Sequence, residues 1–292
     1  MDITTLITDI QQRITQRDGW FTDELSREFS SEVGRRLSEQ LGAAERKPTL
    51  RLSQMGPRCP KALWNSIHHP ELAEKLPPWA EIKYSFGHIL EALAITLAKA
   101  AGHHVTGEQD ALEVDGVVGH RDCIIDGHIV DVKSASSFSF QKFKDGSIRE
   151  NDSFGYLDQL DGYLCGSLSD PLVTDHQFAY LLAIDKQLGH MCLYKHEFRE
   201  QHIRERIRYY KEIVARDTPP KCECGTKAIG KSGNIGLDTK AQYSLFKHSC
   251  FDGIERPKLR TFLYASGPEY LVNVARTPEV PEVDYLGKLV YN

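Results

Sequence analysis

The sequence predicts an α/β protein with a helical N-terminal region, and three observations support this. Apolar residues recur every three or four positions over residues 1–47 and again over 84–103, which is the period of an amphipathic helix. Between residues 111 and 134, short apolar stretches are separated by two Asp-Gly pairs, which favour two-residue hairpin turns. Further helical and extended stretches follow up to residue 216, as in a sheet flanked by helices.

Composition limits the classes of protein to which the chain can belong. Its 292 residues, 40% of them hydrophobic, can form one large core or two modest domains. The formal net charge of −5 argues against coating nucleic acid through overall positive charge, so a polyanion would be held by a local basic patch or by metal ions. Seven scattered cysteines do not suggest a disulfide framework, and we expect a reducing, cytoplasmic compartment. No apolar run approaches the roughly 20 residues of a membrane helix, and no secretory signal is apparent, so we expect no membrane contact.

The N-terminal elements follow from their apolar stripes and breakers. Stripes at residues 6–14 and 25–41 predict helices whose apolar faces pack against a core. The stretch RLSQMGPRCPKALW at 51–64 is rich in Gly, Pro and basic residues, so we expect a loop and then a helix that starts near Pro60. The stretch 84–103 predicts a long helix that carries an acidic residue, Glu91, beside its apolar stripe.

Extended stretches dominate the next part of the chain. Strands are expected at 111–114, 117–125 and 128–134, joined by the Asp-Gly turns into an antiparallel meander. A helix is then expected at 154–168, strands at 176–184 and 190–195, and a helix at 197–216. We therefore divide the chain into a helical N-terminal region with a lead-in segment at 1–83, a core at 84–216, and a turn-rich C-terminal extension packed on the core at 217–292.

Two acidic residues and a lysine stand in the second hairpin. Alternation places Asp131 and Lys133 on one face of a strand and Val132 on the other. In an ideal two-residue hairpin closed at 126–127, Asp131 lies opposite Asp122, and the two carboxylates repel unless a cation lies between them. Mg²⁺ and Mn²⁺ prefer such oxygen ligands, and a neighbouring lysine can stabilise charge or transfer a proton. The pattern predicts a metal site, although a surface ion pair between Asp131 and Lys133 explains the spacing equally well.

The order of these features resembles that of the PD-(D/E)xK nuclease superfamily, and more narrowly its RecB/Cas4-like branch with the phage-encoded exonucleases. D-V-K at 131–133 is similar to the third motif of the family, and Asp122 in GHRD to the acid of the second. Gln159 and Tyr163 are similar to the Q-x-x-x-Y motif that marks the branch. The resemblance covers about residues 84–200.

Two further segments carry the resemblance. Gly87 and Glu91 match the glycine and the helical metal ligand of the first motif, although that ligand is commonly His in the branch. The stretch at 51–64 is similar to the S-x-x-x-x-x-C-P segment that precedes the core.

The resemblance implies a restriction-endonuclease-like core, a central mixed β-sheet flanked by helices, and a Mg²⁺- or Mn²⁺-dependent deoxyribonuclease. It implies that the metal is held by Glu91, Asp122, Asp131 and the backbone carbonyl of Val132. The residues it implies to be catalytic are Asp122, Asp131, Lys133, Gln159 and Tyr163. Lys133 would orient or deprotonate the attacking water, and the products would carry a 5′-phosphate and a 3′-hydroxyl.

The expected partner is DNA, as double-stranded ends or single strands, and the expected activity is exonucleolytic, in phage DNA recombination, repair or degradation. A structure-selective endonuclease and a non-catalytic DNA-binding module are the alternatives. Gln159 and Tyr163 share a helical face and could reach toward the metal or the DNA backbone, whereas the spacing alone favours a core tyrosine beside an incidental glutamine. Local phosphate contacts are expected from Arg51, Ser53, Arg58, Lys61, Lys142 and Lys144, for which solvated loops are the other interpretation.

The cysteines are a second candidate metal site. Many relatives of this branch bind an iron–sulfur cluster through one cysteine before the core and three after it. Cys59 and Cys250 fit the outer positions, but the stretch TKAQYSLFKHSC lacks the closely spaced middle pair. Cys222 and Cys224 form C-x-C instead, which is poorer ligand spacing than C-x-x-C. We therefore expect buried or incidental thiols and no iron–sulfur cluster or zinc.

Overall fold

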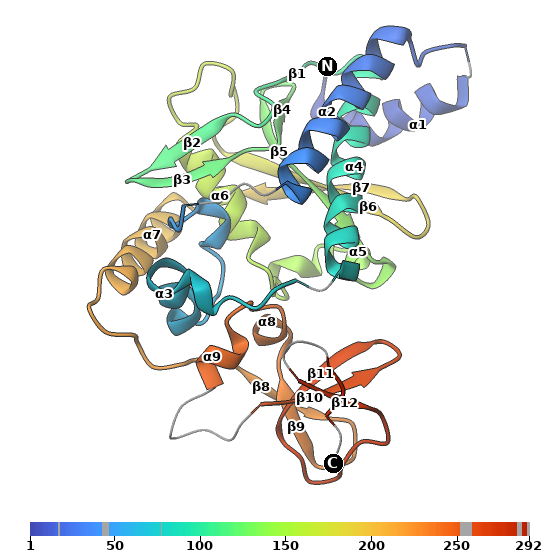
Figure 1. Ribbon diagram of the computed structural model, residues 1–292. Coiled ribbons are helices and arrows are strands. Elements are labelled where there is room, and N and C mark those ends of the chain that lie inside the picture. The colour runs from blue at the N-terminus through green and yellow to red at the C-terminus, as the bar shows by residue number, and fades with distance from the viewer. Residues whose placement is uncertain (17, 43–46, 77, 252–258, 285–287, 291–292) are drawn as a thin grey trace. The chain divides into compact units, whose positions relative to one another are not determined.

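The computed structural model describes the whole chain except residues 17, 43–46, 77, 252–258, 285–287 and 291–292 (Figure 1). The chain forms two compact units. Unit 1 comprises Met1–Lys47, Arg51–Gly56 and Pro77–Glu205, and unit 2 comprises Pro48–Leu50, Pro57–Leu76 and Arg206–Asn292. These units do not coincide with the three consecutive segments expected from the sequence, and the boundaries of those segments stay a prediction.

Helices α1 (Leu6–Gln16), α2 (Asp23–Leu41) and α4 (Pro78–Ala100) form the helical part of unit 1, and α2 lies against α4 (Figure 1). The predicted N-terminal helices are thus present. Thr22 caps α2 by accepting a hydrogen bond from the backbone N–H of Leu25. Helix α4 begins six residues before the predicted start, at Pro78, since proline suits a first helical turn.

The central sheet of unit 1 has the order β1-β4-β5-β6-β7, and only the β5–β6 pair is parallel, so the sheet is mixed as predicted. Its strands are β1 (Val105–Thr106), β4 (Cys123–Ile125), β5 (His128–Ala135), β6 (Phe178–Asp185) and β7 (Met191–Glu197). Val130 and Val132 of β5 pack in a core with α1 and α4. Helices α5 (Ser137–Lys144) and α6 (Tyr156–Gly166) also contact β5 and β6. Asp131 and Lys133 alternate with these valines along β5, so their side chains point away from the core that β5 forms with α1 and α4.

The predicted meander is wrong at its middle strand. The stretch 117–125 divides into β3 (Val117–His120), which pairs with β2 (Ala111–Val114) in a separate two-stranded sheet, and β4 of the central sheet. The break falls at Arg121, whose buried guanidinium lies 2.6 Å from carboxylates of both Asp110 and Asp170. Its backbone N–H bonds the Asp110 carbonyl, which removes it from the strand ladder.

Both Asp-Gly turns form as predicted. Asp115 and Gly116 have φ of 50° and 81°, and Asp126 and Gly127 have φ of 49° and 81°. Positive φ at both central residues is the type I′ geometry, which matches the twist of antiparallel strands.

Unit 2 contains α3 (Pro60–His68), which begins at the predicted proline, and a five-stranded antiparallel sheet that the sequence did not predict. The sheet has the order β12-β10-β11-β9-β8, with β8 (Thr226–Ile229), β9 (Asn234–Leu237), β10 (Arg260–Tyr264), β11 (Gly267–Asn273) and β12 (Glu282–Val283). Short helices α8 (Thr239–Gln242) and α9 (Lys247–Phe251) lie between β9 and β10 in the chain. These strands are short and alternate poorly in burial, so they lack the period-two pattern that reveals a strand.

The remaining elements are short or cross the units. Helix α7 (Glu200–Val214) runs through the boundary between units 1 and 2, and the 3₁₀ turns are η1 (Ile3–Thr5), η2 (Leu52–Gln54), η3 (Pro70–Leu72) and η4 (Ser147–Arg149). Across the ranges that the structure describes, no helix combines the length and the apolar character needed to cross a membrane.

Candidate active site

The second hairpin brings the two predicted carboxylates together. Strands β4 and β5 pair in the register Cys123 with Val130 and Ile125 with His128, so the next position outward places Asp122 across from Asp131. The Oδ2 atom of Asp122 accepts a hydrogen bond of 2.8 Å from the backbone N–H of Val132. This contact fixes the Asp122 carboxylate beside β5, where the sequence argument had placed it.

Helix α6 supplies the groups that hold Asp131. The Gln159 amide donates to Asp131 Oδ1 at 3.2 Å and to the Tyr163 hydroxyl at 2.6 Å, and its Oε1 accepts from Lys133 Nζ at 3.4 Å. Lys133 Nζ also lies 2.5 Å from Asp131 Oδ2 and 4.9 Å from the ring centre of Tyr156. The four predicted residues Asp131, Lys133, Gln159 and Tyr163 therefore form one connected network.

Burial gives this network unusual protonation behaviour. The Asp131 side chain is fully buried, and this burial raises the pKa of Asp131 to about 7 against the opposing charge of Lys133. Burial, followed by the charge of Asp122, raises the pKa of Glu91 to about 8. Burial alone would lower the pKa of Lys133, but the charges of Asp131 and Asp122 overcome it and hold that pKa well above its ordinary value. Negative charge on Asp131 and Glu91 is therefore poorly solvated, and additional positive charge nearby is stabilising.

Sequence reasoning missed the residues that hold Glu91. Arg36 of α2 lies 2.6 Å from Glu91 Oε2 and 2.6 Å from Glu32, and the Gln109 amide donates to Glu91 Oε1 at 2.9 Å. Arg36 is 4% exposed, the only buried residue of α2 among those described. The available signal was an arginine three positions after Val33, on the apolar face of a predicted helix.

We expect Arg36→Met to lower the free energy of unfolding by about 3–5 kcal/mol in EDTA, because it leaves the buried Glu91 carboxylate without its countercharge. Adding Glu91→Gln in the same chain should restore a large part of that loss. Urea unfolding of the two single variants and the double variant measures the coupling. The matched control is Arg35→Met, because Arg35 is a neighbouring exposed arginine paired with Glu32 and Glu39, and its loss should cost about 1 kcal/mol or less. Equal costs at the two positions would contradict the assigned role of Arg36.

The donor set fits a hard divalent cation. Carboxylates of Asp122 and Asp131 lie side by side next to the backbone of Val132, and Glu91 is close enough for the Asp122 charge to raise its pKa. The buried Asp131 Oδ2 already lies 2.5 Å from Lys133 Nζ, so a divalent ion would share this carboxylate with the ammonium. Carboxylate and carbonyl oxygens are the ligands of Mg²⁺ and Mn²⁺.

Gln159→Ala is expected to slow turnover about tenfold and to raise the Mn²⁺ concentration needed for half-maximal activity, because it removes the donor that orients Asp131. Tyr163 is 3% exposed and its hydroxyl accepts from Gln159, so Tyr163→Phe should have a smaller effect of the same kind. Activity against Mn²⁺ concentration for each variant tests this, with the exposed Gln141→Ala on α5 as control. A slower rate with an unchanged Mn²⁺ midpoint would assign Gln159 to the substrate instead.

The predicted DNA-contacting residues are divided between the two units. Arg51 and Ser53, at η2, and Lys142 and Lys144, on α5, belong to unit 1. Arg58 and Lys61 belong to unit 2. Lys142 Nζ lies 5.4 Å from the ring centre of Phe138, which is 78% exposed. Their contacts with DNA stay a prediction.

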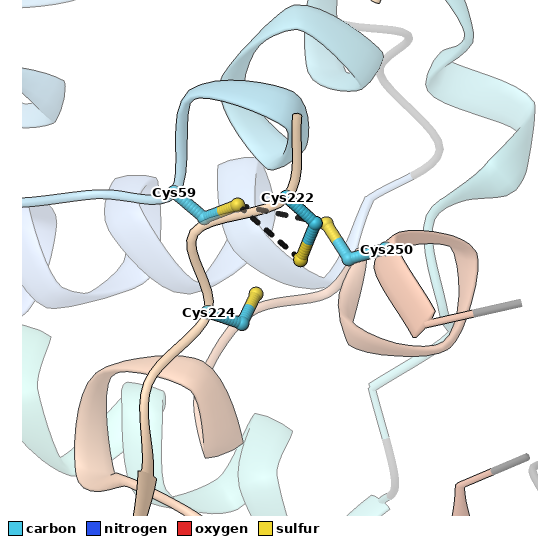
Figure 2. A group of neighbouring side chains, drawn as sticks. All are labelled: Cys59, Cys222, Cys224 and Cys250. Carbon is cyan, nitrogen blue, oxygen red and sulfur yellow. Dashed lines mark hydrogen bonds between the residues drawn. The ribbon is translucent and has the colours of Figure 1, made fainter. Parts of the chain in front are cut away.

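The structure brings four of the seven cysteines together in unit 2. The sulfur atoms of Cys59, Cys222, Cys224 and Cys250 all lie within 4.8 Å of one another (Figure 2). We expected unrelated thiols, but these four lie together. The C-x-C spacing of Cys222 and Cys224 does not keep their sulfurs apart. The other three cysteines, Cys123, Cys165 and Cys192, are free thiols of unit 1.

Comparisons with known proteins found neither a matching family model nor a matching curated protein. Among solved structures, SSO0001 is 14% identical with a TM-score of 0.41, over 74% of this chain and 93% of that one. A phage related exonuclease from Haemophilus somnus 129PT is 14% identical with a TM-score of 0.39, over 57% and 93%. The alkaline exonuclease LHK-Exo from Laribacter hongkongensis is 16% identical with a TM-score of 0.33, over 66% and 91%. All three TM-scores lie below 0.5, and the candidate site is defined by this chain's own side chains.

Proposed function

We propose that the protein is a Mg²⁺- or Mn²⁺-dependent deoxyribonuclease that hydrolyses phosphodiester bonds from DNA ends. The observation that carries this proposal is the buried Asp131 carboxylate, which lies across from Asp122 and contacts both Lys133 and Gln159. This is the arrangement that the D…D-V-K and Q-x-x-x-Y motifs of the PD-(D/E)xK nucleases imply.

Asp122, Asp131 and the Val132 carbonyl would hold the divalent ion, with Glu91 completing the set. When bound, the ion lowers the pKa of a water molecule and stabilises negative charge on the phosphate. The Val132 N–H orients the Asp122 carboxylate, and the Gln159 amide orients that of Asp131. Glu91 forms an ion pair with Arg36. It can therefore bind the divalent ion only if the ion and the guanidinium share its carboxylate.

Lys133 serves best as a cation. Because Asp131 and Asp122 hold its pKa above the ordinary value, its ammonium stays protonated near neutral pH. A protonated Lys133 can donate a hydrogen bond to the attacking water or to a phosphate oxygen, and it offsets charge that develops there. Of the two roles expected from the sequence, we favour orientation and charge stabilisation over deprotonation of the water.

The test compares end-labelled linear DNA with closed circular DNA of the same sequence, each in Mg²⁺, Mn²⁺ or EDTA. Degradation of linear DNA alone, dependent on the ion, is the expected result. Nicking of closed circles would replace the exonuclease with a structure-selective endonuclease. Retention of DNA without cleavage in either ion would overturn the enzymatic proposal and leave a DNA-binding module. We propose cleavage from DNA ends rather than at internal sites because the motifs resemble those of phage-encoded exonucleases.

A further inference from the structure

We propose that Cys59, Cys222, Cys224 and Cys250 form a mononuclear zinc site that holds unit 2 together. Cys59 precedes α3, Cys222 and Cys224 precede β8, and Cys250 lies on α9, so the four side chains come from three separate segments. Their sulfurs are turned toward one another (Figure 2). Four thiolates are a common ligand set of structural zinc.

The distances between the sulfurs fit the ligands of a single metal ion. A tetrahedron of sulfurs around one Zn²⁺, with Zn–S of about 2.3 Å, has edges of about 3.8 Å. The sulfur of Cys59 lies 3.9 Å from that of Cys222 and 3.9 Å from that of Cys250, and no pair of the four exceeds 4.8 Å. The thiols therefore already lie at almost the spacing that a zinc ion imposes.

An iron–sulfur cluster needs ligand sulfurs that lie farther apart than this. Its thiolates bind two or four different irons separated by bridging sulfides, so thiolates on different irons lie much farther apart than ligands of one ion. Four sulfurs that all lie within 4.8 Å of one another leave no room for such a core. This geometry disagrees with the iron–sulfur cluster that many relatives of the branch bind. It also replaces our sequence-based expectation that no zinc is bound.

The surroundings of the sulfurs suit a closed structural site. The N–H of Glu223 donates to Cys59 Sγ at 3.3 Å, and hydrogen bonds of this kind offset the negative charge of a metal thiolate. Cys222 and Cys250 are buried in the core cluster of unit 2 with Leu237, Phe251 and other apolar side chains. Four thiolates fill the tetrahedral set of a zinc ion and leave no position for a water ligand, which separates a structural zinc site from a catalytic one.

Zinc binding would join parts of unit 2 that are distant in the chain. Cys59 is 163 residues from Cys222 and 191 residues from Cys250. Direct contacts already align these segments: Asn65 on α3 donates to Ser249 on α9 at 3.1 Å, and Trp64 donates to the Arg216 carbonyl at 2.8 Å. A metal bound to prepositioned ligands contributes its binding free energy to folding.

The direct test is the metal content of protein purified without oxygen and without chelators. We expect one zinc ion per chain, no acid-labile sulfide and no visible colour. Replacement by Co²⁺ should give the intense visible bands of a tetrahedral thiolate site and a sulfur-to-metal charge-transfer band. Titration of the intact protein with a thiol-directed mercurial should release one zinc ion, measured with a zinc-sensitive dye.

Matched variants assign the ligands. Cys59→Ser and Cys224→Ser should each lose the zinc and lower the midpoint of thermal unfolding, whereas Cys192→Ser, at a half-buried cysteine of β7, should keep both. Asp131→Asn should retain one zinc ion per chain, which separates this site from the proposed active site. The proposal is overturned by several irons per chain with acid-labile sulfide, by disulfides among the four, or by four reactive thiols without zinc. Since the wild-type metal content decides, a variant that fails to fold does not remove the test.

Discussion

Asp131→Asn is expected to reduce DNA cleavage by more than about 100-fold, which corresponds to roughly 2.7 kcal/mol of activation free energy. Asp131 is fully buried across from Asp122, and asparagine keeps its volume but removes the charge that would bind a divalent ion. Its amide can still meet Gln159, so the fold should persist by circular dichroism. Single-turnover cleavage of end-labelled linear DNA in Mg²⁺ and Mn²⁺ measures the loss.

The matched control for this change is Glu113→Gln, at an exposed acid of β2 in the same unit. It should leave cleavage unaltered. Retention by Asp131→Asn of more than about a tenth of wild-type turnover, a cost below roughly 1.4 kcal/mol, would remove Asp131 from the metal site. DNA binding in Ca²⁺ should survive the substitution, since we expect phosphate contacts from other residues.

Lys133→Met is the second change with a large expected effect, again more than about 100-fold in cleavage. It removes the ammonium that lies 2.5 Å from Asp131 Oδ2, while its chain still fills the space. Two effects should separate this variant from a simple loss of stability. Without metal, the unpaired Asp131 should lower the free energy of unfolding by about 3 kcal/mol, and a saturating divalent ion should restore part of it.

Thermal unfolding of the Lys133→Met variant with EDTA, Mg²⁺ or Mn²⁺ measures both effects. Lys186→Met, at an exposed lysine just after β6, is the control and should alter neither stability nor cleavage. Normal cleavage by Lys133→Met, with unaltered stability, would show that the Asp131–Lys133 contact is an incidental ion pair. That outcome would restore the surface ion-pair interpretation that spacing alone left open.

The sequence was informative wherever geometry depends on neighbouring residues. Alternation along β5 separates Asp131 and Lys133 from Val132, and the Asp126-Gly127 turn sets the register that places Asp122 across from Asp131. The four-residue spacing of Gln159 and Tyr163 likewise puts them on one face of α6. Each of these relations spans at most about a dozen residues, and local backbone rules determine them.

The environment of these residues depended on contacts that local rules do not specify. The predicted strand at 117–125 is interrupted at Arg121, which forms ion pairs with Asp110 and Asp170. The apolar pattern alone predicted one continuous strand. Glu91 meets Arg36 only because α2 packs on α4, so a residue with the pattern of a metal ligand is first a partner in a buried ion pair.

By itself, the sequence determined an α/β core, the Asp-Gly hairpins and the shared face of Asp131 and Lys133, because turns, alternation and helical period act over a few residues. Only the tertiary structure decided that Arg36 neutralises Glu91, that residues after 217 form a second sheet, and that four thiols converge. The cysteines show the reason most clearly. Ligand spacing such as C-x-x-C is a local rule, whereas Cys59 meets Cys250 across 191 residues through the packing of α3 and α9, which no local spacing encodes.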